Sequence, residues 1–224
     1  MNCNAPENQT NRRILLFACG AALAMACTAS LAQPAHAYRL TPPPVPSNIQ
    51  VPAGNKAFLK GHAFGTQNYI CLPLPPPPGG PGGFAWTFFA PQATLFNHKK
   101  QVITHFLSPN LGPIAPEVAG TARATWQHSR DTSTVWAFAT PATTSSDPAF
   151  VAPGAIPWLL LQVVGAKDGP TGGHKLTATT FIHRLKTSGG LAPPSDECTQ
   201  STIGAKKLVP YTADYFFYKA AKSK

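Results

Sequence analysis

The chain has 224 residues, a formal net charge of +10, 43% hydrophobic residues and 12% charged residues. Its length is sufficient for one domain with a buried core, and its 10% of aromatic residues excludes a disordered chain. Few charges combined with many β-branched and aromatic residues are typical of an exported domain that is rich in strands.

Residues 1–37 have the pattern of a cleaved export signal. Two adjacent arginines precede an apolar, alanine-rich run over residues 14–31, and small-residue cleavage patterns end at Ala32 and Ala37. Both cleavage sites remain open, as do the general secretory and the twin-arginine export routes. We therefore expect an exported protein, periplasmic or extracellular, that has no transmembrane segment after cleavage.

Cleavage removes three of the five cysteines and leaves Cys71 and Cys198. An even pair in an oxidising compartment indicates one disulfide bond, although two buried free thiols are the alternative. The bond would close a loop of about 127 residues and stabilise the fold by roughly 4–5 kcal/mol. Neither cysteine lies in a Cys-x-x-Cys motif, so a catalytic thiol is not expected.

The remaining chain has a predicted order of lead-in, domain and tail. Residues 38–52 are rich in proline, and we expect them to be extended and solvated. Residues 53–218 form a single β domain, and residues 219–224 form a basic tail. Strand-like segments cover residues 57–63, 66–72, 84–89, 93–96, 101–107, 121–128, 133–139, 157–164, 176–185 and 209–218. This pattern predicts an all-β fold, either an antiparallel β-sandwich or a closed β-barrel of about nine or ten short strands with Pro/Gly-rich loops.

Motifs for the common catalytic chemistries are missing from the sequence. It contains no Gly-x-Gly-x-x-Gly motif, no P-loop and no Gly-x-Ser-x-Gly motif. The sequence therefore predicts a non-enzymatic binding or structural protein of the cell envelope or extracellular space. The basic excess leaves open an anionic envelope polymer or polysaccharide as a partner. Nucleic acid is not expected, because the positive residues are scattered without a run of five or more.

Histidines on predicted strands define the alternative function, a metal-binding protein or a metal-dependent enzyme. His105 and His128 could converge on copper or zinc, with Asp131 as a hydrogen-bond acceptor behind them. A structural role for both histidines is the leading interpretation. We therefore expect the protein to bind no cofactor. The four tryptophans could form a sugar-stacking platform, but their apolar segments favour core packing.

Five blocks, in order along the chain, resemble a known family. Residues 65–71 contain Gln-x-Tyr-x-Cys, and residues 84–95 contain Trp-x-Phe-x-Ala-Pro-x-Ala-x-Leu. The other blocks are residues 156–161, 180–190 and 209–218. Together they resemble the exported bacterial and fungal family called domain of unknown function 3455. The resemblance implies export, one domain and a bond between the two remaining cysteines. It carries over no catalytic residues, because the family has no established activity.

Overall fold

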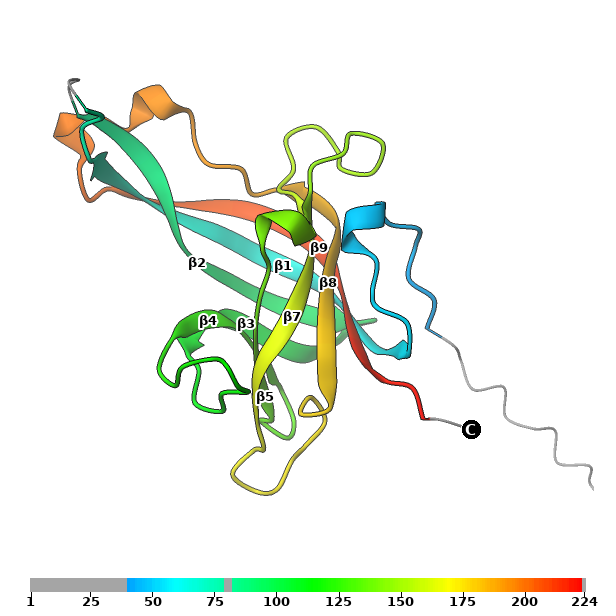
Figure 1. The fold of residues 1–224 in the computed structure, drawn as a ribbon. Helices are drawn as coiled ribbons and strands as arrows, with labels where there is room; N and C mark the ends of the chain where they lie inside the picture. The colour runs from blue at the N-terminus through cyan, green and yellow to red at the C-terminus, as the bar shows by residue number, and fades with distance from the viewer. Residues whose placement is uncertain (1–39, 79–81, 223–224) are drawn as a thin grey trace, which may run out of the picture. The chain divides into compact units, whose positions relative to one another are not determined.

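The computed structural model describes residues 40–78 and 82–222. The predicted export signal and its two cleavage sites lie outside this part of the chain. The described residues form nine β-strands and four short 3-10 helices, coloured along the chain in Figure 1. No helix within the described ranges has the length and hydropathy that crossing a membrane requires. The prediction of an all-β fold is confirmed.

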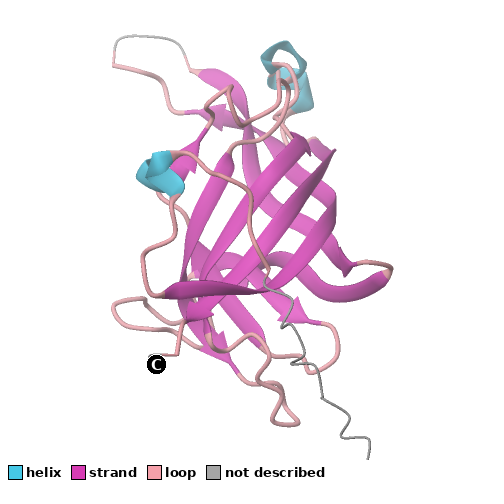
Figure 2. Ribbon diagram, turned by 90° about the vertical axis from the view of Figure 1, so that its right-hand side faces the viewer, coloured by secondary structure: helices cyan, strands magenta, loops and turns pink. Residues whose placement is uncertain are grey.

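The strands form one antiparallel sheet that closes on itself (Figure 2). They are β1 (Asn55–Leu74), β2 (Gly83–Asn97), β3 (Lys100–Pro109), β4 (Ala122–His128), β5 (Thr134–Phe138), β6 (Thr144–Ser145), β7 (Trp158–Lys167), β8 (Thr179–Gly189) and β9 (Lys206–Ala220). Neighbouring strands follow the order β5-β4-β3-β2-β1-β9-β8-β7, and pairing of β5 with β7 closes the ring. The short strand β6 is an addition that pairs with β7. Of the two predicted architectures, the closed barrel is therefore the observed one.

Strand β1 is continuous through Gly65, although the sequence pattern predicts a break between two strands there. A side chain at Gly65 would overlap the backbone of Gln92 on β2. The glycine therefore permits a close approach of two strands and does not form a turn. The predicted strands 84–89 and 93–96 are likewise parts of one strand, β2. The predicted segments are thus strands, as expected, but each is only part of a longer observed strand.

Strands β7, β8 and β9 carry apolar side chains on both faces. On β9, Tyr215 and Phe217 belong to the core inside the barrel, whereas Phe216 and Tyr218 belong to a second cluster on the outer face. Successive strand residues point to opposite sides of a sheet. The continuous apolar runs in these strands therefore require cover on the outside of the barrel as well as within it.

The proline-rich lead-in supplies part of this outer cover. Ile49, in the 3-10 helix η1 (Ser47–Ile49), is fully buried in the outer cluster. His183 on β8 holds it there, because His183 Nε2 donates a hydrogen bond of 2.6 Å to the Ile49 carbonyl oxygen. Three further residues of the lead-in pack against the cluster: Leu40, Val45 and Val51. The prediction of a solvated lead-in is wrong for residues 40–51, because its apolar residues cover an otherwise bare sheet face.

The loop between β7 and β8 helps to fill one end of the barrel. Leu176 in this loop is fully buried in the core, and β8 begins only at Thr179. The Asp131 carboxylate, in the turn between β4 and β5, accepts a hydrogen bond of 2.8 Å from the Lys175 backbone N–H. It also accepts bonds from the backbone N–H (3.0 Å) and the hydroxyl (2.7 Å) of Ser133. One carboxylate thus connects a turn and a loop that are distant in the sequence.

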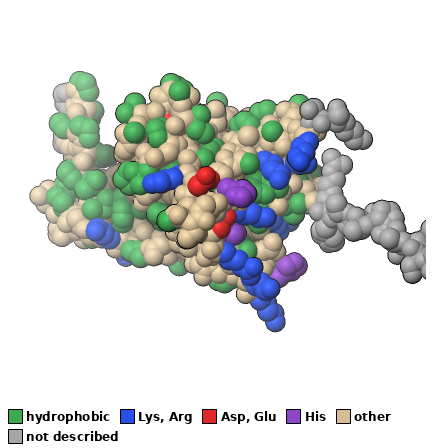
Figure 3. Space-filling model, turned by 90° about the horizontal axis from the view of Figure 1, so that it is seen from below, with side chains coloured by type: hydrophobic (Ala, Val, Ile, Leu, Met, Phe, Trp, Pro, Cys, Tyr) green, Lys and Arg blue, Asp and Glu red, His purple; other side chains and the backbone are tan. Residues whose placement is uncertain are grey.

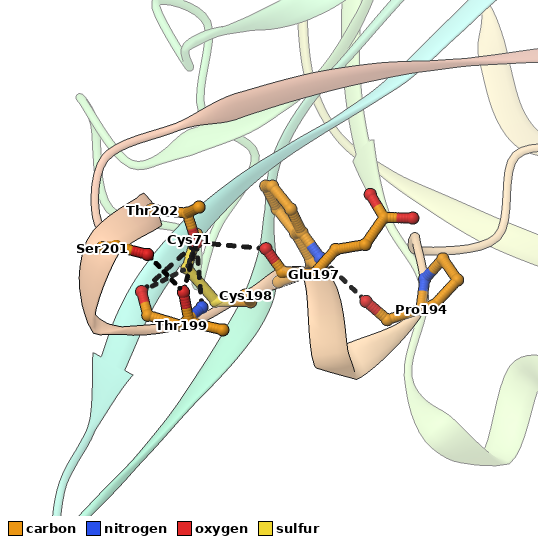
Figure 4. The surroundings of a disulfide bond; sticks show 8 residues. Cys71, Pro194, Glu197, Cys198, Thr199, Ser201 and Thr202 are labelled. Atoms are coloured by element: carbon orange, nitrogen blue, oxygen red, sulfur yellow. Dashed lines mark hydrogen bonds between the residues drawn. A yellow bond between two sulfur atoms is a disulfide. The ribbon is translucent and has the colours of Figure 1, made fainter.

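A disulfide bond joins Cys71 on β1 to Cys198, with the two Cα atoms 5.4 Å apart. Cys198 lies between the 3-10 helices η3 (Ser195–Glu197) and η4 (Gln200–Thr202), in the orange segment beside the extended ends of β1, β2 and β9 (Figure 1). Figure 4 shows the threonines around the bond, where the Thr202 hydroxyl accepts a hydrogen bond of 2.8 Å from the Thr199 backbone N–H. The predicted cysteine pairing is confirmed.

Candidate functional site

A cavity of about 420 Å³ lies inside the barrel. Each of the eight strands in the closed ring contributes a lining residue, which in chain order are Tyr69, Phe88, His105, Trp126, Ala137, Leu161, Arg184 and Tyr215. A space lined by every strand of the ring is the lumen of the barrel. Its volume lies within the range of small-molecule sites in proteins, about 300–1,000 Å³.

The alternation of side chains along the strands creates an apolar wall in the lumen. Leu159 and Leu161 on β7 line the cavity, whereas Leu160 between them packs in the outer cluster. Further apolar lining residues come from other strands and loops: Phe88, Pro91, Leu107, Phe138 and Ile156. This wall suits a ligand with an apolar body.

His105 and Trp126 form a stacked pair in the wall. They lie directly opposite each other on β3 and β4, with ring centroids 4.3 Å apart and planes 10° from parallel. Burial lowers the pKa of His105 to about 3, with the Thr125 carbonyl opposing this change and the Arg184 charge adding to it. His105 Nδ1 lies 2.9 Å from the Thr125 carbonyl oxygen and donates to it. The ring is therefore neutral and presents Nε2 as a hydrogen-bond acceptor.

Two buried tyrosines add hydroxyl groups beside this pair. The hydroxyl oxygens of Tyr211 and Tyr215, both on β9, lie 3.2 Å apart. Burial raises the pKa of both phenols, and the Arg184 charge opposes this rise without reversing it. Both tyrosines are therefore neutral near pH 7. Tyr215 lines the cavity and packs edge-on against Trp126, with ring centroids 5.9 Å apart.

Two buried N–H groups on the wall, Gln67 Nε2 and Trp126 Nε1, have no hydrogen-bond partner within the described part of the chain. The Gln67 side chain interacts with the Tyr211 hydroxyl and so opposes the rise that burial causes in the pKa of Tyr211. The distance and angle at Gln67 Nε2 are nevertheless not those of a hydrogen bond. A buried donor without an acceptor costs about 1–3 kcal/mol. The third such group, Trp158 Nε1, belongs to the outer cluster. Both N–H groups are themselves buried within the wall, so they are not exposed to the space that a ligand would fill.

Two arginines line the cavity and differ in their partners. Arg123 on β4 is neutralised by Glu117, whose carboxylate accepts hydrogen bonds of 3.0 and 3.2 Å from the guanidinium. Arg184 on β8 donates from Nε (3.3 Å) and Nη2 (2.9 Å) to the Pro157 carbonyl oxygen. Arg184 forms no ion pair with an acidic residue in the described ranges, and no described lining residue is Asp or Glu. The lumen therefore holds one uncompensated positive charge.

The predicted metal ligands His105 and His128 lie on neighbouring strands but have different surroundings. His105 is part of the cavity wall, whereas His128 lies opposite Ile103, with its Nδ1 2.9 Å from Asp131 Oδ1. The structure thus brings Asp131 to His128 and not to His105. Among residues 40–78 and 82–222, no group of three or more His, Cys, Asp or Glu side chains is placed to hold a metal ion. Copper or zinc binding stays a prediction.

A second hollow lies between the β4–β5 turn and the β7–β8 loop. Its lining includes the basic side chains of Arg130, Lys175 and Lys219 together with the Asp131 carboxylate. Seen from below, Lys and Arg side chains form several separate groups, with histidines and acidic residues between them (Figure 3). Because the positive charges form no continuous stripe on this face, it supports a bound polymer less well than the lumen supports a small ligand.

Sequence reasoning identified His105 as a candidate but missed Gln67, Tyr215 and Arg184. One signal was available, because Gln67 and Tyr69 are two residues apart in a strand and therefore share a face. Both line the cavity. A polar residue on the inner face of a barrel strand indicates either a buried network or a ligand.

Comparison with known proteins gives a family but no activity. No curated protein and no solved structure matches the chain at a significant level. A family model described as "Protein of unknown function (DUF3455)" matches residues 52–219. These residues include all the side chains that line the lumen. The chain therefore belongs to this family of proteins of unknown function.

Proposed function

We propose that this protein is an exported, non-enzymatic binding protein that holds a small organic molecule inside its barrel. The observation that carries the proposal is the lumen of about 420 Å³, whose apolar wall also carries the polar side chains of His105, Tyr215 and Arg184. An apolar wall with a few converging polar groups is the usual composition of a small-molecule site.

Two independent features support export. The first 37 residues have the pattern of a cleaved signal, and disulfide bonds such as Cys71–Cys198 persist in oxidising compartments. An exported protein of this kind is located in the periplasm or outside the cell. An anionic envelope polymer at the basic hollow, or copper or zinc at His105 and His128, has less support in the geometry.

The ionisation of the lumen favours binding over catalysis. A general acid or base works best with a pKa near the operating pH. Burial lowers the pKa of His105 to about 3 and raises the pKa of Tyr215, so neither group exchanges a proton readily near pH 7. These side chains are better suited to hold a ligand by hydrogen bonds and packing.

Titration with N-phenyl-1-naphthylamine, an uncharged aromatic dye that fluoresces in apolar surroundings, tests the lumen as a binding site. We expect saturable binding of the dye to the disulfide-bonded domain. Ala139→Leu puts a larger side chain at a partly buried lining position. This variant is expected to weaken dye binding by about tenfold, equivalent to about 1.4 kcal/mol.

Ala152→Leu is the matched control, because it makes the same change at an exposed position that does not line the cavity. It is expected to bind the dye as the wild type does. Circular dichroism establishes that both variants are folded. The proposal fails if the folded wild type shows no saturable binding, or if the two variants bind equally well.

A further inference from the structure

We infer that the ligand of the lumen is a small monocarboxylate whose carboxylate is held by Arg184. The inference rests on the proposed function, because it names the class of molecule that the same cavity takes. Its starting point is the contrast between the two lining arginines. Glu117 neutralises Arg123, whereas Arg184 has no acidic partner among the described residues.

The Arg184 charge acts across the lumen. It opposes the burial-driven rise in the pKa of Tyr69 on β1, and it adds to the burial-driven fall in the pKa of His105 on β3. Arg184 is partly buried, so water screens its charge only in part, and an opposite charge with hydrogen bonds would compensate it further. The guanidinium has five N–H donors; Nε and Nη2 donate to the Pro157 carbonyl oxygen, and the guanidinium also interacts with the Tyr215 hydroxyl. Donors therefore remain for a ligand.

The neutral polar groups of the wall do not by themselves select an anion, because His105 Nε2 is an acceptor. Trp126 Nε1 and Gln67 Nε2 have no acceptor in the described part of the chain, but both atoms are buried within the wall. The charge of Arg184 therefore decides the headgroup of the ligand. A carboxylate has two acceptor oxygens in one plane, which match the planar fork of an arginine.

The charge and the wall limit the ligand further. One uncompensated positive charge matches one negative charge, and a dianion such as a phosphate monoester would leave a net negative charge beside a largely apolar wall. Phe88, Leu107 and Leu159 line the same space and require an apolar body behind the carboxylate. A ring or short chain that ends in a single carboxylate meets both conditions.

Displacement of the bound dye by 2-naphthoate and by 2-naphthamide tests the inference. The two molecules share a ring system and differ in charge at one group. The wild type is expected to bind 2-naphthoate about tenfold or more tightly than 2-naphthamide, equivalent to about 1.4 kcal/mol or more. Arg184→Gln removes the charge, and we expect it to abolish this preference. Arg184→Lys keeps the charge without the planar fork, and we expect it to retain part of the preference.

Lys99→Gln is the control for net charge, because Lys99 is exposed and lies outside the cavity, and it should keep the full preference. Equal binding of the two naphthalene compounds by the wild type overturns the inference, and this comparison needs no variant to fold. A preference that persists in folded Arg184→Gln also overturns it. In both cases dye binding still supports the proposed function, whereas failure of the dye itself to bind removes that function.

Discussion

Replacement of Cys71 and Cys198 by alanine is expected to lower the free energy of unfolding by about 4 kcal/mol. The bond closes a loop with a sequence separation of 127 residues, and its removal frees the unfolded chain from that constraint. Alanine is the appropriate replacement, because both sulfurs are buried and a serine hydroxyl would add an unsatisfied polar group. Urea denaturation at pH 7, followed by circular dichroism, measures the change.

Reduction of the wild type provides the control for the alanine substitutions themselves. Wild type in excess dithiothreitol should unfold at nearly the urea concentration that unfolds the double variant. Without reductant, Cys71 and Cys198 should resist alkylation, because the disulfide bond leaves neither as a free thiol. A double variant as stable as the oxidised wild type would contradict the expected contribution of the bond.

Asp131→Ala is expected to lower the free energy of unfolding by about 3 kcal/mol at pH 7. The carboxylate accepts hydrogen bonds from Ser133, Lys175 and His128 and so holds the loop that buries Leu176. A hydrogen bond to a charged group contributes about 1.5–3 kcal/mol. The side chain is 26% exposed, so water replaces part of the lost bonding and the effect is smaller than a full sum.

This contribution depends on pH in a definite direction. Burial of the Asp131 carboxyl acts to raise its pKa, but the hydrogen bonds from Ser133 and Lys175 and the nearby His128 together hold it below the ordinary value. A lowered pKa in the folded state stabilises the fold fully above the unfolded pKa of about 3.9 and loses this effect at lower pH. The difference between variant and wild type should therefore shrink as the pH falls from 6 to 2.5.

Asp168→Ala is a matched control in the β7–β8 loop, which the Asp131 carboxylate contacts. Asp168 is exposed, and no hydrogen bond or ion pair of its side chain is observed among the described residues. Its replacement should change stability by less than about 0.5 kcal/mol. If Asp131→Ala has an equally small effect at pH 7, the carboxylate does not hold the loop as inferred.

The predictable part of the fold followed from short-range patterns. Alternation over residues 121–128 indicated the strand that became β4, and the apolar run 157–164 indicated β7. The proline-rich lead-in was misjudged, because a local pattern does not reveal that residues 40–51 meet the exposed apolar face of β8 and β9. Strand type is encoded within a few residues, whereas cover of a sheet face depends on distant segments.

The cavity was less predictable than the strands around it. His105 was identified from its place in a strand, but its stacking on Trp126 depends on the register between β3 and β4. The role of Arg184 was not visible, because an arginine in a strand is ordinary until its surroundings are known. Only the folded barrel places Arg184 in the cavity wall, where none of the described lining residues is acidic.

The sequence by itself determined that this is an all-β domain with one disulfide-bonded cysteine pair, and its motif blocks identified the family. These conclusions rest on side-chain period, cysteine parity and local motifs, which need no knowledge of distant contacts. The tertiary structure alone decided that the sheet closes through β5 and β7 and encloses a lumen. It also decided which arginine is neutralised and which is not. Closure and charge pairing join residues that are distant along the chain, so no local pattern could predict them.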